Sequence, residues 1–572
     1  MYLNHSSHEV ELSNEVSYYQ IKILETGNTR KTWNKGLAEI QYEYNSQNQL
    51  KAVSEKLLFY TDSNSIKLIS EGDILLLSSK ISQIKNKGNP GEFDAMLYWK
   101  SKKTYLLSFF DYTDFSILKN EPITHKKAME NALNEIIDNN LPKSQTGLAK
   151  ALFLGDKSAL STEITNSFSA AGAMHLLAIS GLHIGLMILV LMNVFRVFSR
   201  FINKYQATCI VILFIWFYAY LIGFPPSVVR SVFMFSLITL GSLFSAQNNQ
   251  LNLLCFSAVA LLLLNPWYLF DIGFQLSYLA MFGILITYTR IQRFYYFKNK
   301  IIRFLWNGTA LGLSAQIFTV PLCLYYFHQF PNYFALTNLG IILISGILIS
   351  LGAGLFLFSW SPLLSIGIGF ALSSLLYLLV NFIDLIEQLP GSVSKGFELS
   401  EFELISIYFL IIVLVFSAIY RFFPLLKYFL TLGILLTLSF HRYKHLNTNH
   451  LILFNENKLC FAIHIKNHIY FFYDDLVINE YKYQRLMESY EKCYPGNISA
   501  ISIKEKNVTS SFKNNKISLQ TIDHKKYLIL NDTKYQIVYD NSNYDSKEAN
   551  QIGMPWVQGL KTTLNKAIII PL

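Results

Sequence analysis

Long apolar runs dominate the chain from residue 173 onward. The block 304–383 contains no Asp, Glu, Lys or Arg, and an uncharged stretch of this length indicates a lipid environment rather than water. At about 20 apolar residues per crossing, the pattern predicts ten membrane spans, at residues 174–197, 207–223, 227–245, 250–265, 272–289, 304–327, 333–359, 362–389, 402–420 and 423–440. We therefore expect a polytopic α-helical membrane protein.

Both ends of the chain have a different pattern. Short runs alternate apolar and polar residues over 18–115 and again after residue 441, which is typical of strands separated by turns. Between them, Lys126 to Leu141 and Gln145 to Leu154 have amphipathic helical spacing. The predicted domains are a small β barrel or sandwich, an amphipathic helical connector, a transmembrane bundle and a small C-terminal β or α/β domain, at residues 1–115, 116–172, 173–440 and 441–572.

Composition supports this division. The 572 residues are 52% hydrophobic and 15% charged, against roughly 25% charged in soluble domains. This excludes a disordered chain, a collagen or a small disulfide scaffold, and argues against an ordinary soluble enzyme. Of the five cysteines, Cys209, Cys255 and Cys323 lie in apolar runs, as buried small hydrophobes do. Cys460 and Cys493 could form a disulfide in an oxidising compartment, although spacing alone does not show it.

Basic residues predict the orientation. Residues 173–440 hold 12 Lys/Arg and 6 Asp/Glu, and the cations gather at 196–204, 290–303 and 421–427. In a ten-span count these loops share one side, which the positive-inside rule places in the cytoplasm. Both end domains would then face outward. Because residues 1–30 have no apolar signal core, we expect a leading membrane segment to be missing from this sequence.

A few polar residues interrupt the apolar runs. Asp271 stands at the external start of a span, with Gln275 one turn later, and serves either as a helix N-cap or as a site for a cation or polar substrate. His175 and His183 lie about 80° apart on a helix and either line a polar path or hydrogen-bond to neighbouring helices. Arg230 either meets phosphate, pairs with Asp271 or extends to lipid headgroups.

Two other classes of function remain open. Ser180, next to Gly181 and near both histidines, allows an intramembrane hydrolase with a serine dyad, although two side chains fixed on one helix rarely align for attack. A lipid or small-solute transporter would be favoured by internal symmetry between the two halves of the bundle, and the sequence has none that we detect. There is also no Walker lysine motif for an ATPase.

Two strings resemble a known family. LFLGDKSALSTEITNSFSAAGAMHLLAISGLHIGL at 152–186 and NPWYLFDIGFQLSYLAMFGIL at 265–285 resemble the signature segments of the ComEC/Rec-type competence proteins. The GDILLLSSKI and NPGEFDAMLYW strings are similar to the OB-like domain of that family. The resemblance covers about residues 20–440. Its motifs contain the candidate residues Gly155, Asp156, His175, Ser180, Gly181, His183, Asp271, Gln275 and Ser277, to which the residue analysis adds Arg230.

The resemblance implies a channel that moves single-stranded transforming DNA across the bacterial inner membrane, with the lipid bilayer around it. It also implies separate partners: a DNA receptor, a cytoplasmic helicase or motor, and a nuclease. Two features of the family are missing here, namely the leading membrane helices and the His-x-His-x-Asp-His metal string of a β-lactamase-like nuclease domain. His464 and His468 are four apart in one expected strand, about 13 Å from each other. We therefore expect no metal, no cofactor and no catalysis, and a C-terminal domain that is degenerate or unrelated.

Overall fold

The computed structural model divides the chain into two units, each described by itself. The first contains residues 1–84, 95–320 and 330–394, and the second contains 85–94, 321–329 and 395–572. The structure describes residues 17–27, 33–44, 50–86, 88–120, 125–177, 179, 181–197, 200, 202–241, 249–397, 399–420, 431, 433–434, 450–454, 460–465, 468–473, 480–494, 497–502, 507–512, 515–522, 525–530, 533–537 and 568–571.

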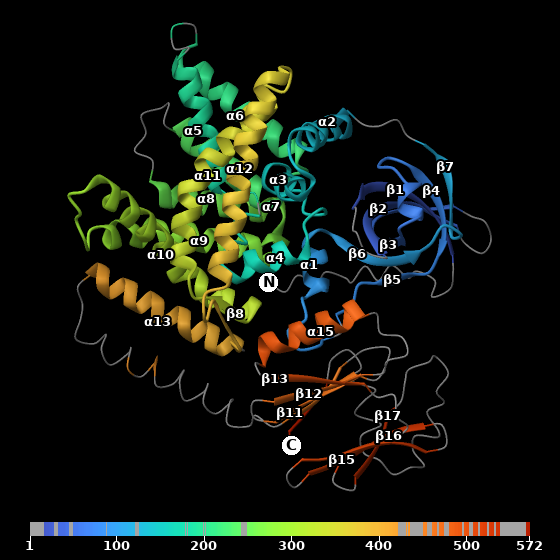
Figure 1. Cartoon of the computed structure of the whole chain (residues 1–572). Coiled ribbons are helices and arrows are strands. Elements are labelled where there is room, and N and C mark those ends of the chain that lie inside the picture. The colour runs from blue at the N-terminus through green and yellow to red at the C-terminus, as the bar shows by residue number, and fades with distance from the viewer. Residues whose placement is uncertain are drawn as a thin grey trace. The chain divides into compact units, whose positions relative to one another are not determined.

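The first unit opens with a mixed seven-stranded sheet (Figure 1) in the order β5-β6-β3-β2-β1-β4-β7. Its strands are β1 (Ser17–Thr26), β2 (Trp33–Tyr44), β3 (Leu50–Asp62), β4 (Ile74–Ser79), β5 (Ile81–Gln83), β6 (Thr104–Phe110) and β7 (Phe115–Lys119). Only the β3–β6 pair is parallel; the other pairs are antiparallel.

Alternation of apolar residues builds this sheet. Along β1, Tyr19, Ile21 and Ile23 are buried while their neighbours are not, which puts every second side chain into one core. The β pattern predicted for residues 18–115 is therefore confirmed as a sheet. Two helical pieces interrupt it, η1 (Ser65–Lys67) and α1 (Ala95–Ser101). The sequence analysis did not anticipate α1, whose Trp99 is buried in a small core with Leu58 and Ile84.

Three amphipathic helices follow: α2 (His125–Asn140), α3 (Lys143–Leu154) and α4 (Thr162–Ala170). The first two match the predicted helical segments. All three pack into one core with two later helices, α11 (Phe334–Leu357) and α12 (Pro362–Glu387). The contact is close, because a Cβ at Gly352 would lie 2.3 Å from the Phe153 ring and one at Gly369 would lie 2.7 Å from the Asn140 carbonyl. These helices are therefore part of the bundle as well as a connector.

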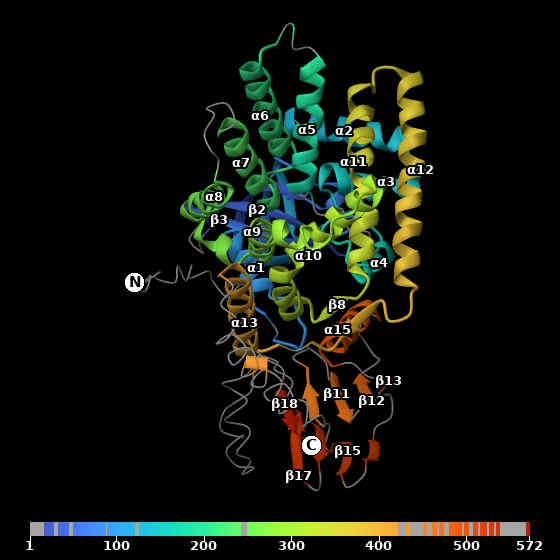
Figure 2. The ribbon, with the colours of Figure 1, turned by 90° about the vertical axis from the view of Figure 1, so that its left-hand side faces the viewer.

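The remaining helices of the bundle are α5 (Gly181–Val197), α6 (Lys204–Leu221), α7 (Pro226–Gly241), α8 (Gln250–Leu264), α9 (Ile272–Gln292) and α10 (Lys300–Phe327), with η2 (Pro266–Phe270) before α9. Helix α13 (Glu401–Tyr420) follows in the second unit. Short strands β8 (Gln329–Pro331) and β9 (Val393–Lys395) form a two-stranded sheet. Figure 2 shows α11 and α12 running alongside each other, with α5, α6 and α7 in a second group.

The described helices occupy nine of the ten predicted spans. By length and composition, five of them can cross a membrane, namely α6, α9, α10, α11 and α12; α7, α8 and residues 183–197 of α5 are shorter apolar helices. The tenth predicted span, 423–440, lies mostly outside the described residues. The count of ten crossings therefore stays a prediction.

The predicted start of the first span, residue 174, is wrong. Helix α5 begins at Gly181, and His175 lies in the turns that precede it. The chain leaves helix α4 through Gly172, whose φ of +77° is left-handed. The apolar residues after it, including Leu176 and Leu177, belong to the core shared with α11 and α12. They are apolar because they are buried in protein, not because they cross lipid as a helix.

The second unit contains two further sheets. One has the order β13-β12-β11-β10-β18 and the other β14-β15-β16-β17, and the helix α15 (Glu480–Cys493) supplies Tyr490 to a core with Phe454 and Phe471. The strands are β10 (His450–Leu453), β11 (Cys460–Ile465), β12 (His468–Tyr473), β13 (Asn497–Ser502), β14 (Asn507–Phe512), β15 (Asn515–Ile522), β16 (Lys525–Leu530), β17 (Thr533–Ile537) and β18 (Ile568–Pro571).

The expectation that His464 and His468 share one strand is wrong. His464 is in β11 and His468 is in β12, and the two strands pair antiparallel with Ile465 opposite His468. The two strands form a hairpin with two residues between them, whereas the alternating sequence suggested one continuous strand. The disulfide between Cys460 and Cys493 stays a prediction, because the side chain of Cys460 lies outside the described residues.

Candidate functional site

Two glycines bring helix α5 close to helix α7. A Cβ at Gly181 would lie 3.3 Å from the Ser231 hydroxyl, and one at Gly185 would lie 3.0 Å from the Phe235 ring. The Ser227 hydroxyl of α7 donates to the Ile179 carbonyl at 3.0 Å, just before α5 begins. Small residues that permit such an approach are typical of helix interfaces in membranes. The glycines of the HLLAISGLHIGL segment therefore act in helix packing.

The two histidines lie near this interface. His183 is buried in α5, with 4% of its surface exposed. His175 is exposed outside the helix and its Nδ1 lies 3.2 Å from the Gly172 carbonyl oxygen. The two imidazoles are close enough to interact electrostatically. The structure therefore brings them together, but the predicted relation of about 80° around one helix is wrong. Ser180, the third polar candidate here, lies outside the described residues.

Arg230 is a buried cation in helix α7. Only 5% of its surface is exposed, so it does not extend to lipid headgroups. Its Nη1 donates to the Gly273 carbonyl of α9 at 2.8 Å, and its guanidinium carbon lies 5.7 Å from the centre of the Tyr278 ring. The Tyr278 and Ser257 hydroxyls lie 3.0 Å apart, which extends the cluster to α8. A buried cation in a membrane bundle is costly unless it has such partners.

Asp271 has the predicted N-cap role. Its Oδ1 accepts from the Phe274 N–H at 2.7 Å, so it is the N-cap of α9. It also attracts Arg230 electrostatically. Gln275 Nε2 donates to the Leu269 carbonyl at 2.8 Å, which joins the start of α9 to η2. Ser277 is half-buried in the same helix. We name Arg230, Asp271, Gly273, Tyr278 and Ser257 the Arg230 cluster.

Gly155 and Asp156 make the turn that ends α3. Gly155 has a left-handed φ of +73°, and the N–H groups of both residues donate to the Lys150 carbonyl. Asp156 Oδ1 accepts from the Ser158 N–H at 2.9 Å, which shapes the turn toward α4. A Cβ at Gly155 would lie 3.3 Å from Ile179 Cδ1. This motif therefore lies against the segment that leads into α5.

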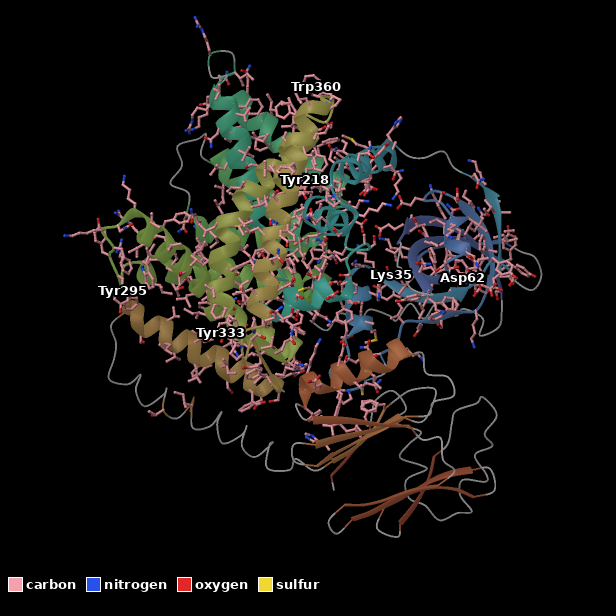
Figure 3. The ribbon with its side chains drawn as sticks, in the orientation of Figure 1. Lys35, Asp62, Tyr218, Tyr295, Tyr333 and Trp360 are labelled. Carbon is pink, nitrogen blue, oxygen red and sulfur yellow. The ribbon has the colours of Figure 1, made fainter. Side chains whose placement is uncertain are left out.

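The sequence analysis missed several hydroxyl groups that link these helices. The Tyr218 hydroxyl of α6, labelled in Figure 3, donates to the Phe153 carbonyl of α3 at 2.7 Å. Tyr278 and Ser257 join α9 to α8 in the same manner. A polar atom at similar depth in two neighbouring apolar helices is the signal that points to such pairs.

Within the described residues, no group of three or more His, Cys, Asp and Glu side chains is placed to hold a metal ion. Among the described residues, the buried polar side chains of the first unit's helices are hydroxyls, the His183 imidazole and the Arg230 guanidinium. Such a set can hydrogen-bond to a polar solute and offers a single buried positive charge.

A model of the competence-protein family matches residues 152–423. This stretch is similar to the competence proteins. The match begins inside α3, ends just after α13 and contains every candidate residue of the motifs. The resemblance to the ComEC/Rec-type competence proteins is therefore confirmed.

The chain is also similar to three curated proteins. The chain is 32% identical to ComE operon protein 3 of Bacillus subtilis (strain 168), over 42% of this chain and 30% of the relative. It is 25% identical to Recombination protein 2 of Haemophilus influenzae, over 48% of this chain and 36% of the relative. An uncharacterized protein of Aquifex aeolicus is 28% identical, over 30% of this chain and 40% of that protein. The chain thus spans less than half the length of these relatives. No solved structure matches it.

Proposed function

We propose that this protein is a DNA-uptake channel of the bacterial inner membrane, through which single-stranded DNA passes into the cytoplasm. The observation that carries the proposal is the competence-family domain over residues 152–423, which contains both signature segments. In the structure these segments meet α7: Gly181 approaches Ser231 and Gly273 binds Arg230. The resemblance thus falls on residues that pack together.

The charge distribution supports the same proposal. A polyanion needs a route with positive potential, neutral hydrogen-bond donors and few carboxylates. The membrane region has one carboxylate between Glu163 and Asp384, namely Asp271, and Arg230 attracts it. We propose that the Arg230 cluster sets the potential along the route and that the buried His183 contributes to its wall.

The finer organisation belongs to this proposal. We expect ten crossings, with the N-terminal sheet and the C-terminal domain both in the periplasm, and with the sheet acting as an OB-like domain that handles DNA through aromatic stacking. The chain itself would be non-catalytic. A separate receptor would deliver DNA, a separate nuclease would degrade one strand, and a cytoplasmic helicase or motor would draw in the other.

The test follows labelled DNA in the natural host. The gene is deleted and then complemented, from its complete natural reading frame, with wild type, Arg230→Gln, His183→Ala or the control Arg196→Gln. Arg196 is an exposed cation at the end of α5, so the control removes equal charge outside the bundle. We expect deletion to leave DNA in the periplasm and the wild type and control to restore entry into the cytoplasm. We expect Arg230→Gln to reduce entry at least about tenfold, the effect of losing one buried charged hydrogen bond.

Immunoblots of the membrane fraction separate loss of transport from loss of protein. Unchanged cytoplasmic uptake after deletion would refute the channel. Full activity of Arg230→Gln at a normal protein level would be consistent with the channel but would limit the Arg230 cluster to a role in helix packing. The same reasoning applies to His183→Ala.

A further inference from the structure

The turn that joins α9 to α10 concentrates positive charge. Residues 290–304, which we name the basic turn, contain no Asp or Glu and five cations: Arg290, Arg293, Lys298, Lys300 and Arg303. Both flanking helices are long and apolar enough to cross a membrane. The end of such a helix lies at the level of the lipid headgroups. The basic turn therefore meets the membrane surface.

Aromatic contacts and hydrogen bonds fix the shape of the basic turn. Trp306 Nε1 donates to the Gln292 carbonyl at 2.9 Å, and Gln292 Nε2 donates to Asn307 Oδ1 at 3.1 Å. The Trp306 ring centre lies 5.4 Å from that of Tyr295, edge to face, and 6.2 Å from that of Phe297. Figure 3 labels Tyr295 at this end of the bundle. The turn is thus held against the first turns of α10.

Two of the five cations are bound to backbone carbonyls of this region. Arg303 donates from Nε to the Phe297 carbonyl and from Nη2 to the Lys298 carbonyl, both at 3.1 Å. Arg290 donates to the Ile286 carbonyl at 2.6 Å. Arg303 therefore orders the turn, whereas Arg290 caps a carbonyl of helix α9.

For the other three cations, no partner is found within the described residues. The side chains of Arg293, Lys298 and Lys300 are exposed, and within the described residues none of them makes a hydrogen bond or an ion pair. Three cations on a fixed turn, without a carboxylate in the segment, form a positively charged surface that attracts anions from outside the chain.

The neighbouring side chains identify the source of the anion. Phe294, Tyr296 and Ile301 are 75%, 78% and 70% exposed, and Ile302 and Phe304 are exposed beside them. Aromatic rings alone would suit the bases of single-stranded DNA. The aliphatic side chains at the start of α10 would instead suit the acyl chains of a lipid, whose headgroup would lie beside the cations.

We propose that the basic turn binds the headgroup of an anionic phospholipid, with the phosphate held by Arg293, Lys298 and Lys300 and the acyl chains against the exposed residues of α10. The proposal does not depend on DNA transport. The bound lipid would hold this end of α9 and α10 at the membrane surface.

The test measures lipid preference in the whole protein. The purified chain is exchanged into micelles containing equal phosphatidylglycerol and phosphatidylcholine, and the lipids that stay bound are quantified by mass spectrometry. The variant carries Arg293→Gln, Lys298→Gln and Lys300→Gln. The control carries Lys51→Gln, Lys56→Gln and Lys67→Gln, three exposed cations of the N-terminal sheet region. Each cation at the surface of an anionic membrane contributes about a fivefold preference for anionic lipid. We therefore expect the preference for phosphatidylglycerol over phosphatidylcholine to fall at least about tenfold in the variant and to stay unchanged in the control.

A charge-preserving variant, Lys298→Arg with Lys300→Arg, should retain the preference and shows that the turn tolerates substitution. An unchanged preference in the glutamine variant would overturn the proposal, as would an equal loss in the control, which would indicate net charge alone. Competition by inorganic phosphate at low millimolar concentration would indicate a site for free anions. Fluorescence anisotropy of a labelled DNA oligonucleotide tests whether the basic turn binds DNA instead. If the glutamine variant loses DNA binding but keeps its lipid preference, the turn binds nucleic acid and the lipid proposal is overturned.

Discussion

At the scale of single residues, Asp62 shows how one carboxylate orders the end of a strand. Its Oδ1 accepts from the backbone N–H of Ser65 at 3.1 Å and from the Ser65 hydroxyl, and its Oδ2 accepts from the Asn64 N–H at 3.2 Å. Figure 3 labels Asp62 at the sheet. The hydrogen bond from the Ser65 hydroxyl, together with those from the two N–H groups, holds the pKa of Asp62 below its ordinary value against the opposing effect of burial.

The sign of the pH effect follows from this lowered pKa. A carboxyl whose folded pKa is depressed stabilises the fold above its unfolded pKa and loses that contribution as the pH falls through the folded pKa. We expect Asp62→Asn to speed hydrogen exchange of the amides in β3 and η1 at pH 7. The loss of local stability should be less than about 1 kcal/mol, because solvent screens the interactions of this side chain. The difference from wild type should shrink as the pH falls below 3.8 and vanish below the lowered pKa of Asp62.

Exchange rates are corrected for the intrinsic rate at each pH, and Glu25→Gln, an exposed neutralisation on β1, is the control. A difference that persists unchanged into acid would contradict the role of the ionised carboxylate.

At the scale of elements, the bundle depends on glycines that let helices touch. A Cβ at Gly283 of α9 would lie 2.4 Å from the Ser314 carbonyl oxygen and 2.9 Å from the Phe318 ring, both on α10. Because a backbone atom cannot move out of the way alone, the two helices would have to separate. At Gly346 of α11, by contrast, a Cβ meets nothing within 4 Å.

These two glycines make a matched pair of alanine substitutions. We expect Gly283→Ala to destabilise the bundle by about 1–3 kcal/mol through overpacking, seen as a lower thermal midpoint in detergent. Gly346→Ala should leave the midpoint unchanged or raise it slightly, since alanine favours the helix. Equal midpoints for the two variants would show that α9 and α10 separate at little cost.

The elements also show what a sequence predicts and what it does not. Predicted spans at 272–289 and 362–389 agree closely with α9 and α12, because an apolar run bounded by polar residues defines a long membrane helix. The start of α5 was missed because apolar composition does not distinguish a protein core from lipid.

At the site, the N-cap role of Asp271 was predictable because it is local. The contact between Arg230 and Gly273 was not, since it joins residues 43 positions apart on different helices. The hydroxyls of Tyr218 and Tyr278 were missed for the same reason: their partners are set by how helices pack, which no local pattern contains.

At the scale of the whole molecule, orientation in the membrane is the property to measure. In a chain whose five cysteines are replaced by serine, a single cysteine is placed by Lys51→Cys in the sheet or Lys298→Cys in the basic turn. We expect an impermeant maleimide to label the first in intact spheroplasts and the second only after permeabilisation, because cationic loops stay in the cytoplasm. The unsubstituted serine background gives the blank. The reverse labelling would invert the proposed orientation.

The core that α2, α3 and α4 share with α11 and α12 also constrains how the protein is made. Leu148 and Leu152 leave the ribosome more than 200 residues before Leu376 and Ile383, their partners in that core. At about 5–20 residues per second, the early helices wait roughly 10 to 40 s with an apolar face uncovered. During that interval they need the translocation machinery, a chaperone or the bilayer surface as a temporary cover, and a chain interrupted before α11 is a ready substrate for membrane proteases.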